Sequence, residues 1–406
     1  MYNAVITLTA SLLRLVAPFH KKLRLMMRGH RQTFSLLQEK IDHSGQYVWF
    51  HAASLGEFEQ ARPLMEAVRR DHPEYKILLT FFSPSGYEVR KDYPLADIVC
   101  YLPFDTKRNV KRFLDLANPK IAIFIKYEFW YNYVHESYLR QIPFYLVSAV
   151  FRPNQIFFKK NGLRYGKMLR YYTHFFVQDE ASAQLLKDHH LHQVSIAGDT
   201  RIDRVIGIQE EARELPLIEK FTDINDLVFI AGSSWAPDED IFIDYFNRHP
   251  AMKLIVAPHE IHESHLAEIE QKLQRPCMRY SKATEDNVMQ QDCLIIDCFG
   301  LLSSIYRYGD VGYIGGGFGV GIHNLAEAAV YGIPVIFGPN YAKFREAHGL
   351  IRHGGGFSID GGEAFNQQMN LFMQDSPARE KAGEKAKAYI FGNAGATNKI
   401  MQYLSL

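Results

Sequence analysis

The chain has 406 residues, of which 47% are hydrophobic and 22% are charged, and its formal net charge is +1. These values are typical of a soluble globular protein with two domains of ordinary size, and the small charge argues against a general nucleic-acid binder. No metal-ligand spacing occurs among the four cysteines, Cys100, Cys277, Cys293 and Cys298. We therefore expect a reduced cytosolic setting, no structural metal and no nucleic-acid partner.

The N-terminal segment, residues 1–31, contains no acidic residue. Residues 4–19 are mostly apolar, but Arg14 and Pro18 interrupt them, which makes the run marginal for crossing a bilayer. The cations that follow are Lys21, Lys22, Arg24, Arg28 and Arg31. An apolar run followed by cations favours a membrane-surface or single-pass anchor, with the body of the protein on the cytoplasmic side. The alternative is an ordinary amphipathic helix that covers the domain.

Residues 32–205 alternate between short apolar runs and segments of helical periodicity, which predicts a doubly wound, mostly parallel α/β sheet. The expected strands are 47–51, 76–82, 98–102, 121–125, 144–148 and 174–177.

The pattern then repeats. Residues 206–226 are polar and charged, which is typical of a linker, and a second α/β domain is expected over 227–377. Its strands are expected at 228–231, 254–257, 294–296, 311–314 and 335–337. Residues 378–406 form a C-terminal helix, interrupted at 392–395, that could pack back on the first domain. Two such Rossmann-like domains are expected to face a central cleft at the carboxyl ends of both sheets.

The glycine-rich stretch 315–321 follows an apolar run and precedes an expected helix start at His323 and Asn324. A helix N-terminus binds anions through its free N–H groups, and Glu327, one turn on, could accept hydrogen bonds from two ribose hydroxyls. The stretch therefore suits a nucleotide-sugar, although such a turn also occurs as plain packing. Candidate phosphate contacts are Gly316, Gly317, Ser233 and Ser234, and helix capping is an equal alternative for the serines.

Glu57 follows a strand and a small-residue turn and lies early in the next helix. A carboxylate in this position can act as a general base or can simply favour the helix N-terminus, and the residues alone leave both readings open.

Several segments, in order and approximate spacing, resemble the 3-deoxy-D-manno-oct-2-ulosonic acid (Kdo) transferases of lipopolysaccharide assembly. The resemblance rests on residues 51–57 (HAASLGE), 127–132 (YEFWYN), 198–203 (GDTRID), 257–259 (APH), 297–301 (DCFGL) and 323–327 (HNLAE). It implies the two-domain GT-B glycosyltransferase fold and transfer of Kdo, with inversion, from CMP-Kdo to a lipid A precursor at the cytoplasmic face of the inner membrane. It also implies that neither a metal nor another cofactor is required.

Carried over by position, the resemblance assigns Glu57 as the catalytic base and Glu128 and Arg201 as groups that stabilise the transition state. The implied CMP-binding residues are Pro258, His259, Phe299, Gly300, Leu301, Asn324, Leu325, Ala326 and Glu327.

The chain departs from the family pattern where Arg201 replaces a lysine, His259 an arginine and Lys126 a glutamate. The family also has an arginine in the segment 148–152, where Arg152 could serve instead. Arginine and lysine differ in reach and geometry, and a neutral histidine holds phosphate less firmly than a cation does. Two alternatives stay open. One is another GT-B transferase that uses a UDP-sugar on a lipid acceptor, and the other is an inert module that binds a sugar-nucleotide or a lipid. The acid at Glu57 counts against the inert module.

Overall fold

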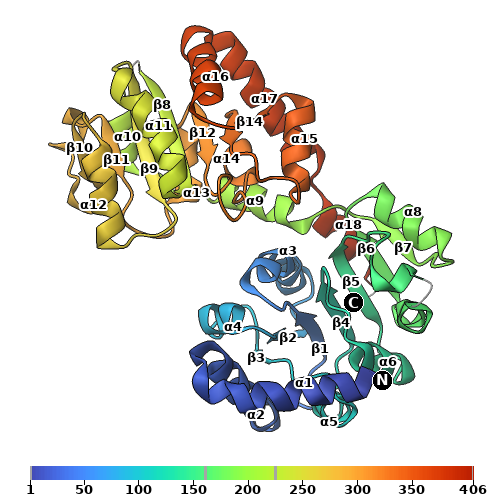
Figure 1. Cartoon of the computed structure of the whole chain (residues 1–406). Coiled ribbons are helices and arrows are strands. Elements are labelled where there is room, and N and C mark those ends of the chain that lie inside the picture. The colour runs from blue at the N-terminus through green and yellow to red at the C-terminus, as the bar shows by residue number, and fades with distance from the viewer. Residues whose placement is uncertain (1, 160–161, 224–225, 405) are drawn as a thin grey trace. The chain divides into compact units, whose positions relative to one another are not determined.

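The computed structural model describes residues 2–159, 162–223, 226–404 and 406. The chain divides into two compact units (Figure 1). Unit 1 comprises Met1–Arg204 and Ala394–Leu406, and unit 2 comprises Val205–Asn393. In the sequence, unit 2 is therefore an insertion into unit 1.

The described strands of unit 1 form one parallel sheet of seven, in the order β3-β2-β1-β4-β5-β6-β7. Their bounds are β1 Tyr47–His51, β2 Lys76–Phe81, β3 Ile98–Tyr101, β4 Ile121–Ile125, β5 Phe144–Ala149, β6 His174–Val177 and β7 Val194–Ile196. The strand order reverses between β1 and β4. In open parallel sheets, ligands bind outside the carboxyl ends of the strands at such a reversal.

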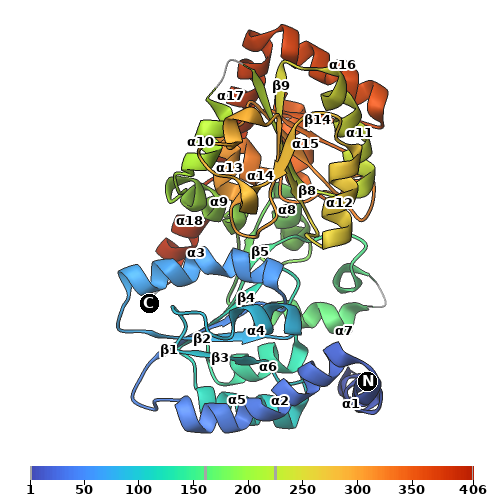
Figure 2. The ribbon, with the colours of Figure 1, turned by 90° about the vertical axis from the view of Figure 1, so that its left-hand side faces the viewer.

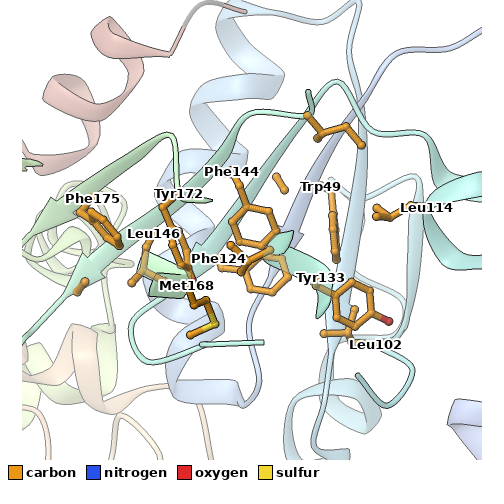
Figure 3. Packing of buried hydrophobic residues seen from close by; sticks show 14 of the residues in the cluster. Trp49, Leu102, Leu114, Phe124, Tyr133, Phe144, Leu146, Met168, Tyr172 and Phe175 are labelled. Carbon is orange, nitrogen blue, oxygen red and sulfur yellow. The ribbon is translucent and has the colours of Figure 1, made fainter. Parts of the chain in front are cut away.

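Because side chains alternate along a strand, the central strands of this sheet contribute to two cores, one on each face. Trp49, Phe124 and Phe144 belong to one core, which is completed from α2, α5 and α6 (Figure 3). Phe50 and Ile123 belong to the other, which is completed from α3 and the C-terminal α18. Figure 2 shows α3 on one side of the sheet and α2, α5 and α6 on the other. The helices of unit 1 are α1 Tyr2–Val16, α2 Lys21–Lys40, α3 Leu55–Asp71, α4 Pro84–Arg90, α5 Lys107–Ala117, α6 Tyr131–Leu139, α7 Leu163–Gly166, α8 Glu180–Asp188 and α18 Ala396–Tyr403.

Unit 2 repeats this plan with a parallel sheet in the order β10-β11-β9-β8-β12-β13-β14, counted over its described strands. The bounds are β8 Leu227–Ser234, β9 Met252–Pro258, β10 Cys277–Arg279, β11 Cys293–Ile295, β12 Val311–Ile314, β13 Val335–Phe337 and β14 Gly356–Ser358. Here the order reverses between β8 and β12. Its helices are α10 Pro216–Thr222, α11 Ala236–Arg248, α12 Glu263–Lys272, α13 Leu302–Ile305, α14 Ala326–Ala329, α15 Arg345–His353, α16 Gly362–Gln374 and α17 Ser376–Gly392.

The strands predicted from the sequence are confirmed in both units, and three short ones, β7, β10 and β14, are additional. The segment 206–226, which reads as a linker, instead carries the end of α9 (Thr200–Glu210) and all of α10, and it belongs to unit 2. The predicted break in the C-terminal helix is also confirmed, because Gly395 is left-handed between α17 and α18. Of these two helices, α17 belongs to unit 2, whereas α18 packs on α3 in unit 1.

Candidate active site

Glu128 lies just after β4, at the reversal of the unit 1 sheet, and a buried network holds its carboxylate in place. Its Oε2 accepts a hydrogen bond of 2.5 Å from Trp130 Nε1 and lies 3.2 Å from Nε2 of His51, the last residue of β1. The other ring nitrogen of His51, Nδ1, lies 2.9 Å from Thr80 Oγ1, to which Trp49 Nε1 also donates. His51 is fully buried, whereas the Glu128 side chain is 12% exposed. Buried partners therefore fix the Glu128 carboxylate, which remains partly exposed to solvent.

Glu57 lies in the first turn of α3, beside this network. Its Oε2 accepts hydrogen bonds from the Ser54 backbone N–H (2.8 Å) and hydroxyl (3.0 Å), which completes a capping box. Burial, and then the charge of Glu128, raise the pKa of Glu57, although the bonds from Ser54 and the proximity of His51 oppose the shift. Glu57 therefore caps the helix, and its raised pKa is also compatible with the role of a general base.

Arg201 lies at the start of α9, after β7, and Asp199 orients it. The Nε and Nη2 atoms of Arg201 donate to Asp199 Oδ2 at 3.2 and 3.0 Å. Burial alone would raise the pKa of Asp199, but the charge of Arg201 and its hydrogen bonds, with one from Gln60, hold this pKa below its usual value. The ion pair leaves the Arg201 side chain one-third exposed. All three predicted catalytic residues therefore belong to unit 1, at the carboxyl edge of one sheet.

Lys126, the position where the family has a glutamate, is the residue directly after β4. Its φ is 63°, a left-handed conformation that is uncommon for a lysine, and its N–H donates to Val147 O. This turn redirects the chain at the end of β4 and brings Glu128 to the sheet edge.

The glycine-rich loop of unit 2 follows β12 at the second sheet reversal, and close backbone packing explains its composition. A Cβ on Gly315 would lie 2.3 Å from Ser233 O, and one on Gly317 would lie 2.5 Å from Gly338 N. Gly316 has a φ of +90°. The N–H of Gly316 donates to Asp238 Oδ2 at 2.9 Å, so this predicted phosphate donor is already engaged by a carboxylate of α11.

Asp238, at the start of α11, joins the loop to the end of β8. Besides Gly316, its carboxylate accepts from Trp235 N (3.0 Å) and from the Tyr313 hydroxyl (2.8 Å). Burial raises the pKa of Asp238, and these three hydrogen bonds limit the shift. Sequence reasoning missed this residue because its partners come from three different segments.

The expected helix start at His323 is wrong. The helix α14 begins only at Ala326 and has four residues, because His323 N donates back to Gly315 O and holds the chain in the loop. So short a helix adds little dipole to anion binding. Glu327 lies on it, and the Asn324 side-chain amide donates to Glu327 Oε1 at 2.9 Å. Leu325 and Ala326 are buried, so their side chains act through packing.

Three rings stack beside this loop. The rings of Trp235 and His259 lie 4.7 Å apart and those of His259 and His323 lie 4.5 Å apart, with interplanar angles of 27° and 26°. Trp235 Nε1 also donates to His323 Nε2 at 3.3 Å. Burial, and secondarily His259, lower the pKa of His323. Trp235 and His323 were not predicted as site residues. Trp235 directly follows a strand, and His323 was named only in the expected helix start and in the motif 323–327.

The remaining predicted CMP residues and phosphate contacts are unevenly exposed. Pro258 ends β9 and is buried, whereas the Phe299 side chain is 76% exposed on a turn where Gly300 is left-handed and Leu301 is half-buried. Ser234 is fully buried, and its hydroxyl donates to Glu239 Oε1 at 2.9 Å, which leaves it facing the core. Ser233 keeps a partly exposed side chain. Among the described residues, no group of three potential metal ligands occurs.

The N-terminal helix α1 presents apolar side chains to solvent. The segment Tyr2–Phe19 has a mean hydropathy of 1.3, and 11% of it is buried in the structure. It is long and apolar enough to cross a membrane by length and composition, which is weak evidence because signal sequences and core helices pass the same criteria. The side chains of Leu8, Leu12 and Leu15 on this helix are exposed.

Comparison with known proteins relates these features to one family. Residues 28–204 match the sequence model of 3-deoxy-D-manno-octulosonic-acid transferase (Kdo transferase). The chain is 27% identical to the enzyme of that name from Aquifex aeolicus over 329 residues, which cover 79% of this chain and 84% of the relative. It is 23% identical to the Haemophilus influenzae enzyme over 378 residues, which cover 88% of this chain and 86% of the relative.

The fold is shared more widely than the sequence. The UDP-GlcNAc 2-epimerase of Neisseria meningitidis superposes with a TM-score of 0.63 at 13% identity, over 88% of this chain and 99% of the epimerase. That similarity concerns the fold alone, which is the GT-B arrangement of two Rossmann-like units. The order of motifs along the chain, together with relatives matched over most of its length, makes this chain a glycosyltransferase similar to the 3-deoxy-D-manno-octulosonic acid transferases.

Proposed function

We propose that this glycosyltransferase moves Kdo from CMP-Kdo to a lipid A precursor, with inversion, at the cytoplasmic face of the membrane. Similarity to the 3-deoxy-D-manno-octulosonic acid transferases supports the identity of the transferred sugar. One observation carries the chemistry: a carboxylate of raised pKa, Glu57, lies beside the rigidly held Glu128 at the reversal of the unit 1 sheet.

Glu57 acts as the general base. The acceptor hydroxyl oxygen bonds to the anomeric carbon of Kdo while the bond from that carbon to the CMP phosphate oxygen breaks, and CMP leaves with the electron pair. The hydroxyl proton passes to Glu57. Both hydrogen bonds from Ser54 end on Oε2, and in the described part of the chain none reaches Oε1, which suits that atom to accept the proton. A raised pKa makes the carboxylate a stronger base near neutral pH.

Glu128 and Arg201 stabilise the transition state with opposite charges. As the bond to CMP breaks, positive charge develops on the sugar, and the carboxylate that His51 and Trp130 hold is fixed before the reaction begins. Arg201, oriented by Asp199, provides a guanidinium for an anionic group of the donor.

The donor nucleotide binds unit 2. Glu327, oriented by Asn324, accepts hydrogen bonds from the ribose hydroxyls, while Pro258, His259 and residues 299–301 surround the CMP. Among the four predicted phosphate contacts, Ser233 and Gly317 fit best, because the Ser234 hydroxyl and the Gly316 N–H have internal partners. No metal or other cofactor takes part.

The exposed apolar side chains of α1 and the cations of α2 attach the protein to the membrane surface where the lipid acceptor lies. Because Arg14 and Pro18 interrupt the apolar run, this attachment is expected to be sensitive to salt.

An in-vitro assay with CMP-Kdo and purified lipid A precursor tests the proposal, with product mass as the readout. The expected product is heavier by one or more Kdo units, and CMP inhibits the reaction more strongly than UDP does. Consumption of a UDP-sugar instead would favour the alternative GT-B transferase, and binding of CMP-Kdo without turnover would contradict the assigned chemistry.

A further inference from the structure

A hollow lined by four arginines lies within unit 1, where the end of α1 meets α2. The arginines are Arg14, Arg24, Arg28 and Arg31, and the side chains of Ala17 and Met27 form a buried apolar floor. The hollow has a volume of about 480 Å³, which is within the range of roughly 300–1,000 Å³ that small-ligand sites occupy.

The helical spacing of the arginines in α2 explains why they line this hollow. Arg24, Arg28 and Arg31 are separated by four and then three residues, so they lie on one face of α2, whereas Met26 and His30 on its other side are buried. The short turn Ala17–Phe19 reverses the chain after α1 and brings Arg14 to the same opening. The arrangement therefore follows from the fold of the helix pair.

No counter-charge pairs with these four guanidinium groups in the part of the chain that the structure describes. In the described ranges (2–159, 162–223, 226–404 and 406), none of them forms an ion pair, and the first 31 residues contain no acid. Like charges gathered around one opening repel one another, so an anion that enters it is bound favourably. Arginine pairs with phosphate through two parallel hydrogen bonds, which lysine does not provide.

Next to the hollow, α1 exposes a stripe of apolar side chains. Leu8, Leu12, Leu15 and Phe19 follow helical spacing along one face, and Phe19, just beyond the helix, is 89% exposed. A free phosphate ion would use only the arginines. A phospholipid combines a phosphate group with hydrocarbon chains and therefore matches both the hollow and the stripe.

We propose that the four-arginine hollow binds the headgroup phosphate of an anionic membrane lipid while the apolar stripe of α1 enters the acyl layer. The inference rests on the membrane attachment proposed above and names its lipid partner and its site. The protein is thereby held at the surface by a specific contact as well as by diffuse attraction.

Co-sedimentation of the full chain with phosphatidylcholine vesicles, with and without a quarter phosphatidylglycerol, tests the proposal. The variant R24Q/R28Q/R31Q should bind the anionic vesicles about a hundredfold more weakly, because each cation near such a surface contributes about a factor of five. The matched control K40Q/K91Q/K187Q removes three exposed cations from the same unit and should lose less than about threefold.

Two further measurements distinguish a specific phosphate site from attraction by diffuse charge. The variant R24K/R28K/R31K keeps the charge and should still bind about threefold or more weakly than the wild type, because the planar guanidinium groups are lost. Inorganic phosphate should displace the wild type no better than chloride at equal ionic strength. Equal losses in the glutamine variant and the lysine control, or an unchanged R24K/R28K/R31K variant, would overturn the site. Selective displacement by inorganic phosphate would overturn the lipid assignment.

Failure of this inference can be distinguished from failure of the proposed function. The glutamine variant should transfer Kdo to detergent-dispersed acceptor at the wild-type rate and unfold at the same temperature, since the arginines are exposed and lie outside the catalytic edge of the sheet. A loss of transfer there would assign the arginines to catalysis instead and would contradict the lipid site.

Discussion

Replacing Glu57 by glutamine separates its role as the helix cap of α3 from its proposed role as the general base. The amide oxygen still accepts hydrogen bonds from Ser54, so the cap on α3 survives with neutral bonds in place of charge-assisted ones, a loss of about 1 kcal/mol. Removal of a partly buried charge beside Glu128 offsets part of that loss. The unfolding temperature should therefore shift by no more than about 2–4 °C, whereas Kdo transfer should fall by about 10²-fold or more.

The pH profile provides a sharper test, because the structure predicts two shifts of opposite sign. As the proposed base, Glu57 must be ionised for transfer, so activity should fall as the pH drops through its pKa, which lies above the usual value of 4.5. The Ser54 hydroxyl lowers that pKa, so Ser54→Ala should move the acid limb of kcat/KM to higher pH. The charge of Glu128 raises it, so Glu128→Gln should move the limb to lower pH while also slowing transfer.

The measurement is the rate of Kdo transfer from CMP-Kdo, followed from acidic to neutral pH in all three variants. Glu59→Gln is the matched control: Glu59 lies on the same helix but pairs with Arg90 and Arg204, so transfer should persist. Near-normal transfer by Glu57→Gln, or an acid limb that moves in neither neighbouring variant, would refute the assignment of Glu57 as the base.

Three further predictions concern other parts of the chain. Trp130→Phe keeps the ring contact with Phe82 but removes the donor to Glu128, so kcat should fall about tenfold with KM for CMP-Kdo unchanged; an unchanged kcat would contradict the positioning role. Glu327→Ala should weaken CMP binding in calorimetry, by roughly 1.5–3 kcal/mol per lost charged bond, and should weaken a ribose-dideoxy analogue much less; equal losses would mean a purely structural role. Deleting residues 2–19 should release the protein to the soluble fraction with activity retained on detergent-dispersed acceptor. Tyr2 donates to the buried Asp105, so a control Tyr2→Phe variant reports the stability lost with that bond.

The sheets were predictable because their central strands are continuous apolar runs buried on both faces. The edge strands β7, β10 and β14 have three residues each and are only partly buried, so no apolar run in the sequence predicts them. The loop after β12 was misread at its end. Glycine followed by His323 and Asn324 looks like a helix start, but hydrogen bonds back to Gly315 and Gly316 keep the chain in the loop.

Sequence patterns could indicate single site residues, but not the contacts between residues that are distant in the chain. The place of Glu57 after a strand and a turn left its role open between general base and helix cap, and the family resemblance assigned it as the base together with Glu128 and Arg201. The partners of Glu128 could not be found in this way. His51 lies 77 residues away and reaches Glu128 only because β1 and β4 are neighbours in the sheet. Trp130 lies two residues after Glu128, and no sequence pattern indicates that its ring N–H donates to this carboxylate.

The return of the C-terminal segment to unit 1 has a consequence for synthesis on the ribosome. Ile400 and Leu404 are core residues of unit 1, and Asp203 accepts hydrogen bonds from the N–H groups of Gly395 and Thr397, so the two ends of the insertion are fastened together. Domains ordinarily fold in the order in which they are translated. Here unit 2 is complete at Asn393, while the α3 face that α18 covers stays open until the last residues emerge. The unit that is translated first is therefore the one whose core is completed last, by residues that follow unit 2 in the chain.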